Sequence, residues 1–276
     1  MKNLDNKNNQ KKYTLITGAT GGLGRAFVNE CALADNNLIL VGTNIDRLNS
    51  FRDKILSKYE GIEVLVYKCD FTISEDLVGL LKYIESNNLK ISRLINNAGY
   101  ICEGSNKYVS LDTLQKCIMV NNLGTTTLTK GVLDLHNASD RLEIITISSL
   151  ASNYPLPYMA VYSATKAYLK SYMLSLREEY KGDNVTILTV LPGAIATSDS
   201  MKEAINAQGL KGRLSAVAPN KIARIALKKS KKNKAQYIPG WFNKLTNVVS
   251  KLVPLSLQIK VAGNMWKKSQ KKRGIK

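Results

Sequence analysis

The sequence has little of what several kinds of active site require. Its 276 residues include one histidine, His136, and four cysteines without a C-x-x-C pair. A single histidine argues against multi-histidine metal catalysis and against a Ser-His-Asp hydrolase. The scattered cysteines, Cys31, Cys69, Cys102 and Cys117, indicate packing thiols in a reducing, cytoplasmic compartment, and no metal site is expected.

Long apolar runs are missing as well. No uncharged apolar stretch reaches the length of about 18 residues that is typical of a membrane-spanning helix. Residues 1–12 are polar and rich in Asn and Lys, so they lack the apolar centre of a secretory signal and are expected to form a disordered, frayed end.

Acidic residues are absent from the last part of the chain. Between Lys221 and Lys276 there are 16 Lys or Arg and no Asp or Glu, which leaves 24 basic and 21 acidic residues in the rest. The net charge of +19 is therefore a property of the C-terminal part. The overall composition, 44% apolar and 22% charged, is that of a soluble globular protein with one sizeable domain.

A glycine-rich turn opens the chain. An apolar strand pattern over residues 13–17 leads directly into Gly18-Ala19-Thr20-Gly21-Gly22-Leu23-Gly24, and a helical pattern follows. Such a turn lets a pyrophosphate approach main-chain N–H groups at a helix N-terminus, so this context indicates a dinucleotide site. Because Gly21 and Gly22 are adjacent, both T-G-x-x-x-G-x-G and T-G-x-x-G-x-x-G fit the spacing.

Strand and helix patterns alternate along the chain. Further strands are predicted at residues 38–42, 63–69, 93–97, 142–148 and 185–191, with helices beginning near Asp46, Ser74, Ser110, Tyr158 and Asn220. Short Val/Ile/Leu-rich strands separated by helices predict an α/β fold with a doubly wound parallel sheet of about seven strands. Ligands bind beyond the carboxyl ends of the strands in such a sheet.

A tyrosine and a lysine stand four residues apart in Tyr162-Ser163-Ala164-Thr165-Lys166, and Ser149 lies 13 positions before the tyrosine. On a helix this spacing places Tyr162 and Lys166 on one face. A neighbouring ammonium is expected to lower the pKa of the phenol and to make it a proton donor and acceptor for a carbonyl/alcohol pair.

Taken together, these motifs closely resemble the short-chain dehydrogenase/reductase family over roughly residues 13–240. The resemblance rests on the glycine turn, Asp70, the N-N-A-G run ending at Gly99, Asn121, the Ser-Tyr-Lys set, and Pro192-Gly193 with Thr197. The N-N-A-G run favours the glycine set Gly18, Gly22 and Gly24.

The resemblance implies a Rossmann-type domain whose catalytic residues are Asn121, Ser149, Tyr162 and Lys166. Tyr162 would exchange the proton, Lys166 would lower the pKa of Tyr162 and hold the nicotinamide ribose, Ser149 would bind the substrate oxygen, and Asn121 would support a water relay. Ser148 is a rival for the role of Ser149, while Asp70 and Asn121 could instead be helix caps. The implied cofactor-binding residues are Thr17, Gly18, Thr20, Gly22, Leu23, Gly24, Thr43, Asn44, Arg47, Asp70, Phe71, Asn97, Ala98, Gly99, Tyr162, Lys166, Pro192, Gly193, Ile195 and Thr197.

The second strand indicates which dinucleotide is preferred. An acidic residue at its end would bind the ribose 2′-hydroxyl of NAD, but Gly42, Thr43 and Asn44 stand there. Without that carboxylate nothing repels a 2′-phosphate, and Thr43, Asn44 and Arg47 could donate hydrogen bonds to it. NADP is therefore expected in preference to NAD, although the arginine usual in the family is missing at position 43.

The C-terminal residues 241–276 are expected to form a basic amphipathic helical tail. Apolar residues from Trp241 to Val253 recur at helical spacing, Pro254 interrupts, and a second stretch, residues 255–266, leads into the lysine-rich end. A Trp-bearing apolar face with a basic polar face suits an anionic membrane surface, with peripheral attachment. The alternative is packing on the protein's own substrate cleft or on a second subunit. A nucleic-acid partner is not expected, because aromatic residues do not interleave with the charges.

Two functions from different classes follow. The first is an NADPH-dependent reductase of a ketone or aldehyde on an apolar, lipid-like or steroid-like substrate, with residues 193–213 as a substrate lid. The second is a catalytically silent dinucleotide-binding scaffold or redox sensor at a membrane. The resemblance also implies a homodimer or tetramer formed through helices near residues 113–137 and 158–180.

Overall fold

The computed structural model describes residues 10–197 and 199–274, and within them seven parallel strands form one sheet in the order β3-β2-β1-β4-β5-β6-β7. The strands are β1 (Lys12–Thr17), β2 (Asn37–Gly42), β3 (Val64–Lys68), β4 (Lys90–Asn96), β5 (Leu142–Ile147), β6 (Val185–Val190) and β7 (Gln236–Tyr237). Winding starts at β1, proceeds outward to β3, and then resumes at β4 in the opposite direction. The junction between β1 and β4 is therefore the point at which a doubly wound sheet binds its ligand.

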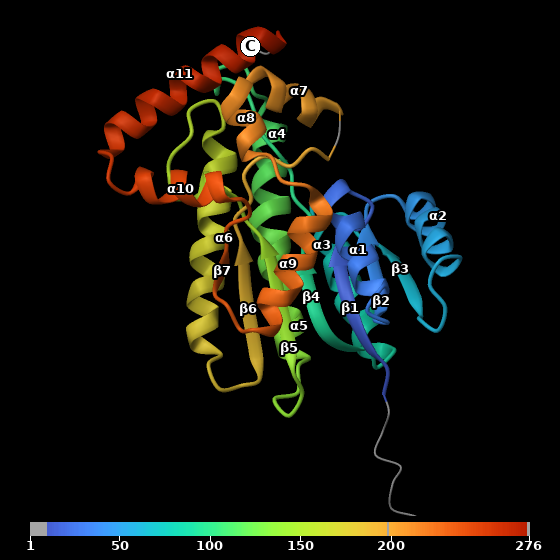
Figure 1. Ribbon diagram of the computed structural model, residues 1–276. Coiled ribbons are helices and arrows are strands. Elements are labelled where there is room, and N and C mark those ends of the chain that lie inside the picture. Colours follow the sequence, from blue (N-terminus) through green and yellow to red (C-terminus); the bar gives the residue numbers. More distant parts are fainter. Residues whose placement is uncertain (1–9, 198, 275–276) are drawn as a thin grey trace, which may run out of the picture.

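Helices cover both faces of this sheet (Figure 1). They are α1 (Gly22–Ala32), α2 (Ile45–Leu56), α3 (Ser74–Ser86), α4 (Leu111–Ile118), the π-helix η1 (Met119–Gly124), α5 (Thr125–Asp134), the 3₁₀-helix η2 (Leu150–Asn153), α6 (Ala160–Glu179), α7 (Asp199–Ala207), α8 (Gly209–Ser215), α9 (Pro219–Lys231), α10 (Trp241–Ser250) and α11 (Leu255–Arg273).

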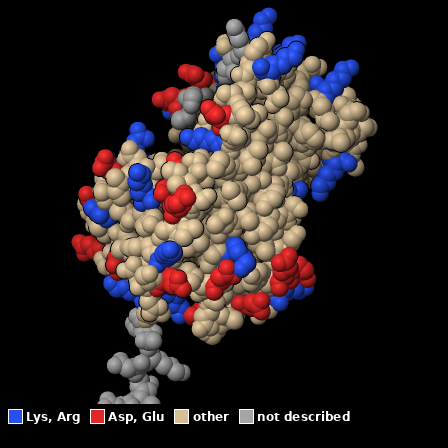
Figure 2. Space-filling model, turned by 180° about the vertical axis from the view of Figure 1, so that it is seen from behind, with Lys and Arg blue, Asp and Glu red and all other residues tan. Residues whose placement is uncertain are grey.

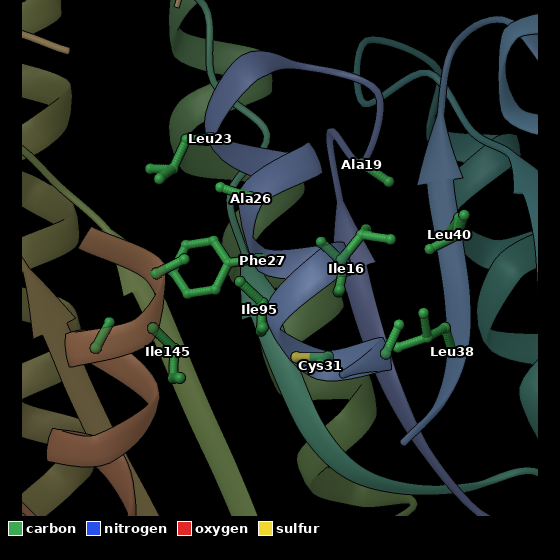
Figure 3. Close-up of a cluster of buried hydrophobic side chains, with 14 of the residues drawn as sticks. Ile16, Ala19, Leu23, Ala26, Phe27, Cys31, Leu38, Leu40, Ile95 and Ile145 are labelled. Carbon is green, nitrogen blue, oxygen red and sulfur yellow. The ribbon is translucent and has the colours of Figure 1, made fainter. Parts of the chain in front are cut away.

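Each face of the sheet has its own apolar core. Side chains of α1, α2 and α9 pack on one face, and those of α3, α5 and α6 pack on the other. Phe27 of α1 is fully buried beside Ile16 of β1 and Ile95 of β4 (Figure 3). Strands buried on both faces explain the nearly continuous Val/Ile/Leu runs in the sequence.

The expected α/β architecture is confirmed, and the predicted strands agree with the observed ones to within a few residues. Of residues 1–12, which were expected to be irregular, residues 1–9 lie outside the described part, and Lys12 already belongs to β1. The C-terminal helices are present as α10 and α11, separated at Pro254. Within the described residues, no helix is both long enough and apolar enough to cross a membrane.

Helix α10 buries a polar residue and exposes its apolar face. Polar Asn243 is buried and donates hydrogen bonds to the carbonyls of Ser215 (2.9 Å) and Pro239 (2.7 Å). Trp241 and Val248 of α10, and Leu252 just after it, instead point outward and are 67%, 58% and 82% exposed. The apolar stripe predicted for α10 therefore does not pack on the chain's own cleft, which was one of the two alternatives for it.

Candidate active site

The glycine turn and the end of β4 are joined by hydrogen bonds through Thr17. The main-chain N–H groups of Asn97 and Ala98 donate to the Thr17 hydroxyl at 3.0 and 2.9 Å. The Asn97 side chain donates to the carbonyls of Thr17 (3.0 Å) and Gly18 (3.1 Å). The carboxyl ends of β1 and β4 are thus held in a fixed relation at the point where the winding reverses.

Three glycines in the turn occupy positions that a side chain would obstruct. Gly18 has φ +61°, a conformation that favours glycine. A Cβ on Gly24 would lie 2.1 Å from the Gly18 carbonyl oxygen, and one on Gly22 would lie 2.4 Å from Thr197 Cβ. A Cβ on Gly21 would come no closer than 3.3 Å to the atoms around it. These contacts support the spacing Gly18, Gly22 and Gly24, and they place Thr197 directly against the turn.

Helix α6 carries both members of the Tyr-Lys pair. The Lys166 ammonium lies 5.8 Å from the centre of the Tyr162 ring and donates to the Ile147 carbonyl at 2.9 Å. Lys166 is only 4% exposed, so its stem and ammonium are enclosed between α6 and the end of β5. The helical spacing of four residues therefore brings the two groups onto one face at the carboxyl edge of the sheet.

The pKa of the phenol shifts in the direction opposite to the one expected. Burial raises the pKa of Tyr162, while a hydrogen bond with the Ser149 side chain acts against this rise. Burial also lowers the pKa of Lys166 to about 8, because the charged form loses its hydration. Burial of the phenol is the largest cause of the rise, and the lowering of the Tyr162 pKa by Lys166 stays a prediction.

The two neighbouring serines have different partners. Ser148 is buried, and its hydroxyl donates to the Lys166 carbonyl at 2.8 Å, which anchors α6 to the end of β5. Ser149 is the N-cap of η2, where its hydroxyl accepts from the Ala151 N–H at 3.1 Å, and it lies near enough to the Tyr162 phenol to act on its pKa. Ser149 is therefore the serine that faces the phenol.

Asn121 lies in the π-helix η1, in the middle of the continuous helix that α4, η1 and α5 form. Its side chain accepts from the Tyr100 N–H (2.8 Å) and donates to the Tyr100 carbonyl (2.9 Å) and to the Thr165 hydroxyl (3.0 Å). A Cβ on Gly99 would lie 3.4 Å from both Asn121 Oδ1 and Lys166 Nζ. Asn121 is thus not a cap: it lies in a π-helix, a feature frequent at functional sites, and its amide and the Lys166 ammonium lie beside the same glycine.

Near the end of β2, Arg47, one of the three expected 2′-phosphate donors, lines a shallow hollow of about 260 Å³. Thr43 and Arg47 are exposed, whereas the Asn44 side chain is engaged as the cap of α2 and accepts from the Arg47 N–H at 2.8 Å. Arg25 and Lys54 line the hollow together with Arg47 and Asp46. Arg25, which directly follows Gly24, is a basic group that the sequence pattern did not single out.

The side chains just after β3 make contacts within the protein, although they were expected to contact the cofactor. The Asp70 carboxylate accepts from the N–H (2.9 Å) and hydroxyl (2.7 Å) of Thr72; burial raises its pKa, but these bonds together with Lys116 and Lys68 lower it overall. Phe71 is buried beneath Gly124, so only its main chain is available to a ligand. Leu23 is likewise a core residue, while Ile195 packs on the core from the loop after β6.

Helix α11 lies over the catalytic pair. Tyr162 of α6 and Trp266 of α11 pack against the same small apolar cluster, formed by Ala151, Leu156, Met159 and Ala262. Arg273, near the end of α11, forms an ion pair with Glu103 in the loop after β4, with an Nη1–Oε2 distance of 3.2 Å. The sequence pattern showed that this segment is helical but did not show that it covers the site.

Some kinds of site are not found in residues 10–197 and 199–274. No three His, Cys, Asp or Glu residues converge there as a metal-binding group. All four cysteines are buried and unpaired.

Comparison with known proteins agrees with this geometry. The family model described as short chain dehydrogenase matches residues 12–208. A very-long-chain 3-oxoacyl-CoA reductase of Bos taurus is 32% identical over 190 residues, which are 67% of this chain and 60% of that protein. A putative steroid dehydrogenase 4 of Caenorhabditis elegans is 34% identical over 191 residues, 67% of this chain and 72% of that protein. The match therefore spans less than two thirds of the bovine protein.

Solved structures share the fold. A 7β-hydroxysteroid dehydrogenase has a TM-score of 0.80 at 24% identity and covers 91% of this chain and 96% of its own. An L-sorbose reductase from Gluconobacter frateurii with NADPH (TM-score 0.73, 23% identity, 84% and 95% covered) and an NAD⁺-bound xylitol dehydrogenase (TM-score 0.74, 20% identity, 84% and 98% covered) are also similar. The family model spans well over half of the chain, and the chain belongs to the short-chain dehydrogenase family of NAD(P)-dependent oxidoreductases.

Proposed function

We propose that the protein is an NADPH-dependent reductase of a ketone on an apolar, lipid-like substrate. The observation that carries the proposal is the grouping of Ser149, Tyr162, Lys166 and Asn121 beside Gly99, next to a glycine turn that has no room for side chains. The names of the similar proteins, a 3-oxoacyl-CoA reductase and a steroid dehydrogenase, support an apolar substrate.

The glycine turn fits the diphosphate of a dinucleotide. Gly18 before α1, and Gly22 and Gly24 in its first turn, leave the main chain free of side chains, and the N-terminus of α1 supplies N–H donors. Lys166 has three N–H donors and uses one of them on the Ile147 carbonyl, which leaves donors for the nicotinamide ribose. When bound there, NADPH supplies a hydride to the carbonyl carbon.

Side chains of the protein bind the carbonyl oxygen of the substrate and supply the proton. Ser149 and Tyr162 donate hydrogen bonds to the carbonyl oxygen, where negative charge develops in the transition state. The raised pKa of Tyr162 keeps the phenol protonated at neutral pH, so it delivers its proton to the oxygen as the alcohol forms. Asn121, fixed by Tyr100, positions the groups around Lys166 through which the phenol regains a proton.

NADPH is preferred because the end of β2 carries no acidic residue. Thr43 and Arg47 are exposed there, and the hollow that Arg47 lines carries Arg25 and Lys54 as well, against one acidic residue, Asp46. A 2′-phosphate would be held by these groups, whereas the 2′-hydroxyl of NADH finds no carboxylate at the strand end.

The test is a panel of aliphatic and steroid ketones, assayed with NADPH and with NADH by nicotinamide absorbance. We expect turnover of apolar ketones, with kcat/KM at least about tenfold higher with NADPH, the effect of one well-placed charged contact. If no ketone is reduced with either dinucleotide while NADPH still binds, the alternative of a silent dinucleotide-binding scaffold is correct. Equal kcat/KM values for the two dinucleotides would refute the cofactor preference alone.

We further propose that α10 and the start of α11 rest on an anionic membrane surface. Their exposed apolar residues are Trp241, Leu245, Val248, Val249, Leu252, Leu255, Leu257 and Val261. The last 56 residues carry no acidic side chain. In Figure 2 the upper part of the molecule shows a broad uncharged surface with Lys and Arg along its edge, and acidic side chains lie at its upper left and lower down.

Co-sedimentation with phosphatidylserine-containing vesicles tests this attachment. The wild type should pellet with the vesicles, and a Val248→Glu/Leu252→Glu variant should remain in the supernatant, because both side chains point outward and a charge there opposes insertion. Leu33→Glu is the control, since Leu33 is 68% exposed at the end of α1. Pelleting of the double variant to the wild-type extent would refute the proposal.

A further inference from the structure

A bridge of three polar side chains joins α6 to α10 through the end of η2. The Lys170 ammonium of α6 donates to Asn153 Oδ1 at 2.6 Å, and Asn153 Nδ2 donates to Asn247 Oδ1 of α10 at 2.7 Å. An ammonium has donors and no acceptor, so the amide oxygen of Asn153 must face Lys170 and its NH₂ group must face Asn247. The bridge therefore has one direction, and Asn247 is the acceptor at its end.

The bond between Lys170 and Asn153 is charge-assisted. In the described part of the chain Lys170 forms no ion pair with a carboxylate. Its ammonium is half-buried and donates to the Asn153 amide oxygen. Hydrogen bonds from a charged donor are shorter and roughly twice as strong as neutral ones, which agrees with the distance of 2.6 Å. Asn153 is thus held firmly from the side of α6.

The α10 end of the bridge is anchored as well. Asn243 lies one turn before Asn247 on the same helical face, is 1% exposed, and donates to the carbonyls of Ser215 (2.9 Å) and Pro239 (2.7 Å). A Cβ on Gly193 would lie 2.8 Å from the side-chain amide atoms of Asn243, so α10 packs directly against the loop after β6. Asn247 is therefore presented by a helix that is fixed to the body of the protein.

The bridge holds the short helix that begins at the proposed substrate-binding serine. Ser149 is the N-cap of η2, and Asn153 is the last residue of that helix. The N–H (3.0 Å) and hydroxyl (2.6 Å) of Ser152 donate to the Ser149 carbonyl, and the Leu150 N–H donates to the Pro192 carbonyl at 2.9 Å. A single 3₁₀ turn is weak by itself because its hydrogen-bond geometry is poor. Contacts from the neighbouring elements therefore fix the position of the Ser149 hydroxyl.

We propose that Asn153, Lys170 and Asn247 are positioning residues for Ser149. They hold η2 so that the Ser149 hydroxyl stays within hydrogen-bond distance of the substrate carbonyl oxygen while negative charge develops on it. This inference rests on the proposed ketone reductase activity and adds residues that act on the reaction through Ser149. A misplacement of about 1 Å in such a group can cost on the order of 10²-fold in rate.

The primary variant is Asn247→Leu, which removes the acceptor and roughly keeps the volume of the side chain. We expect kcat for ketone reduction to fall about tenfold with KM and the Kd for NADPH unchanged, because the Ser149 hydrogen bond strengthens in the transition state. Asn247→Asp keeps the acceptor and should have a kcat near the wild-type level. Thr246→Val is the matched control, since the Thr246 hydroxyl donates to the Asn243 carbonyl within α10 (3.1 Å).

A Ser149→Ala background separates positioning from a general structural effect. In that background Asn247→Leu should cause no further loss of kcat, since its effect passes through the hydroxyl that is already missing. Lys170→Met breaks the other end of the bridge and keeps the apolar stem, so it provides the same test if the Asn247→Leu variant does not fold. It should lower kcat about tenfold in the wild type and should have no effect in the Ser149→Ala background.

Hydrogen exchange of the peptide with residues 149–153 tests the bridge without any turnover. Exchange should be about fivefold faster in Asn247→Leu than in the wild type, as expected for the loss of one hydrogen bond, and unchanged in Asn247→Asp and Thr246→Val. This measurement keeps the two proposals apart. A wild type that reduces no ketone refutes the reductase activity, whereas unchanged exchange in Asn247→Leu refutes the bridge.

Three kinetic results would also overturn the positioning role. The first is an equal kcat in Asn247→Leu and the wild type. The second is a tenfold loss that persists in the Ser149→Ala background, which would mean that Asn247 does not act through Ser149. The third is a kcat of Asn247→Asp as low as that of Asn247→Leu, which would show that the acceptor at this position is not what the reaction needs.

Discussion

Replacing Tyr162 with phenylalanine is expected to lower kcat for ketone reduction by roughly 10²–10⁴-fold while NADPH binding stays near the wild-type level. The phenol lies close enough to the Ser149 side chain for that side chain to act on its pKa, so both hydroxyls can meet the same carbonyl oxygen. Phenylalanine keeps the ring that packs on Met159 and Leu156, so the local fold should survive the loss of the hydroxyl. Steady-state kinetics and NADPH fluorescence titration measure the two effects separately.

The matched control is Tyr168→Phe on the same helix. Tyr168 is 43% exposed, and its hydroxyl lies 3.1 Å from the Thr126 hydroxyl, away from the Ser149 side chain. This variant should keep wild-type kcat. If the Tyr162 variant reduces ketones as fast as the parent, Tyr162 is not the proton donor.

Replacing Gly24 with alanine should weaken NADPH binding by about tenfold or more and lower the thermal stability. The added Cβ would lie 2.1 Å from the Gly18 carbonyl oxygen and 2.9 Å from the side-chain nitrogen (Nδ2) of Asn97, so the main chain of the turn must shift. Backbone strain of this kind costs on the order of 1–3 kcal/mol, and each 1.4 kcal/mol lost from binding is about a tenfold change in Kd. Calorimetric titration with NADPH and a melting curve provide the two measurements.

Gly21→Ala is the control within the same turn. Gly21 has an ordinary φ of −74°, and its added Cβ would meet only the Gly18 carbonyl oxygen, at 3.3 Å. The Gly21 variant should therefore retain most of the NADPH affinity. Equal losses of affinity in the two variants would contradict the assignment of Gly24 to the close approach.

Local sequence patterns were sufficient for the sheet and for placing the Tyr162 and Lys166 pair on one helical face. The strands are continuous apolar runs, because a sheet covered on both faces leaves no solvent side, and such runs can be found without knowing their partners. Tyr162 and Lys166 share a helical face through their spacing alone. The choice of Ser149 over Ser148 also agrees with the structure, in which Ser148 is engaged with the Lys166 carbonyl.

Features that depend on contacts between distant segments could not be predicted in this way. The direction of the Tyr162 pKa shift depends on burial, and α11 together with the residues before α6 provides much of that burial. The ion pair of Arg273 with Glu103 joins the end of the chain to the loop after β4, and no periodic pattern indicates such a partner. Helical periodicity correctly identified the apolar stripe of α10, but it could not show that buried Asn243 would direct the stripe outward.

A crystal structure of the complex with NADPH would show whether the catalytic groups meet a bound nicotinamide. We expect a diphosphate over the glycine turn, a nicotinamide ribose hydroxyl within hydrogen-bond distance of Lys166 Nζ, and a nicotinamide ring that faces the hydroxyls of Ser149 and Tyr162. A dinucleotide bound elsewhere, or a nicotinamide turned away from Tyr162 with Lys166 not in contact with the ribose, would contradict it.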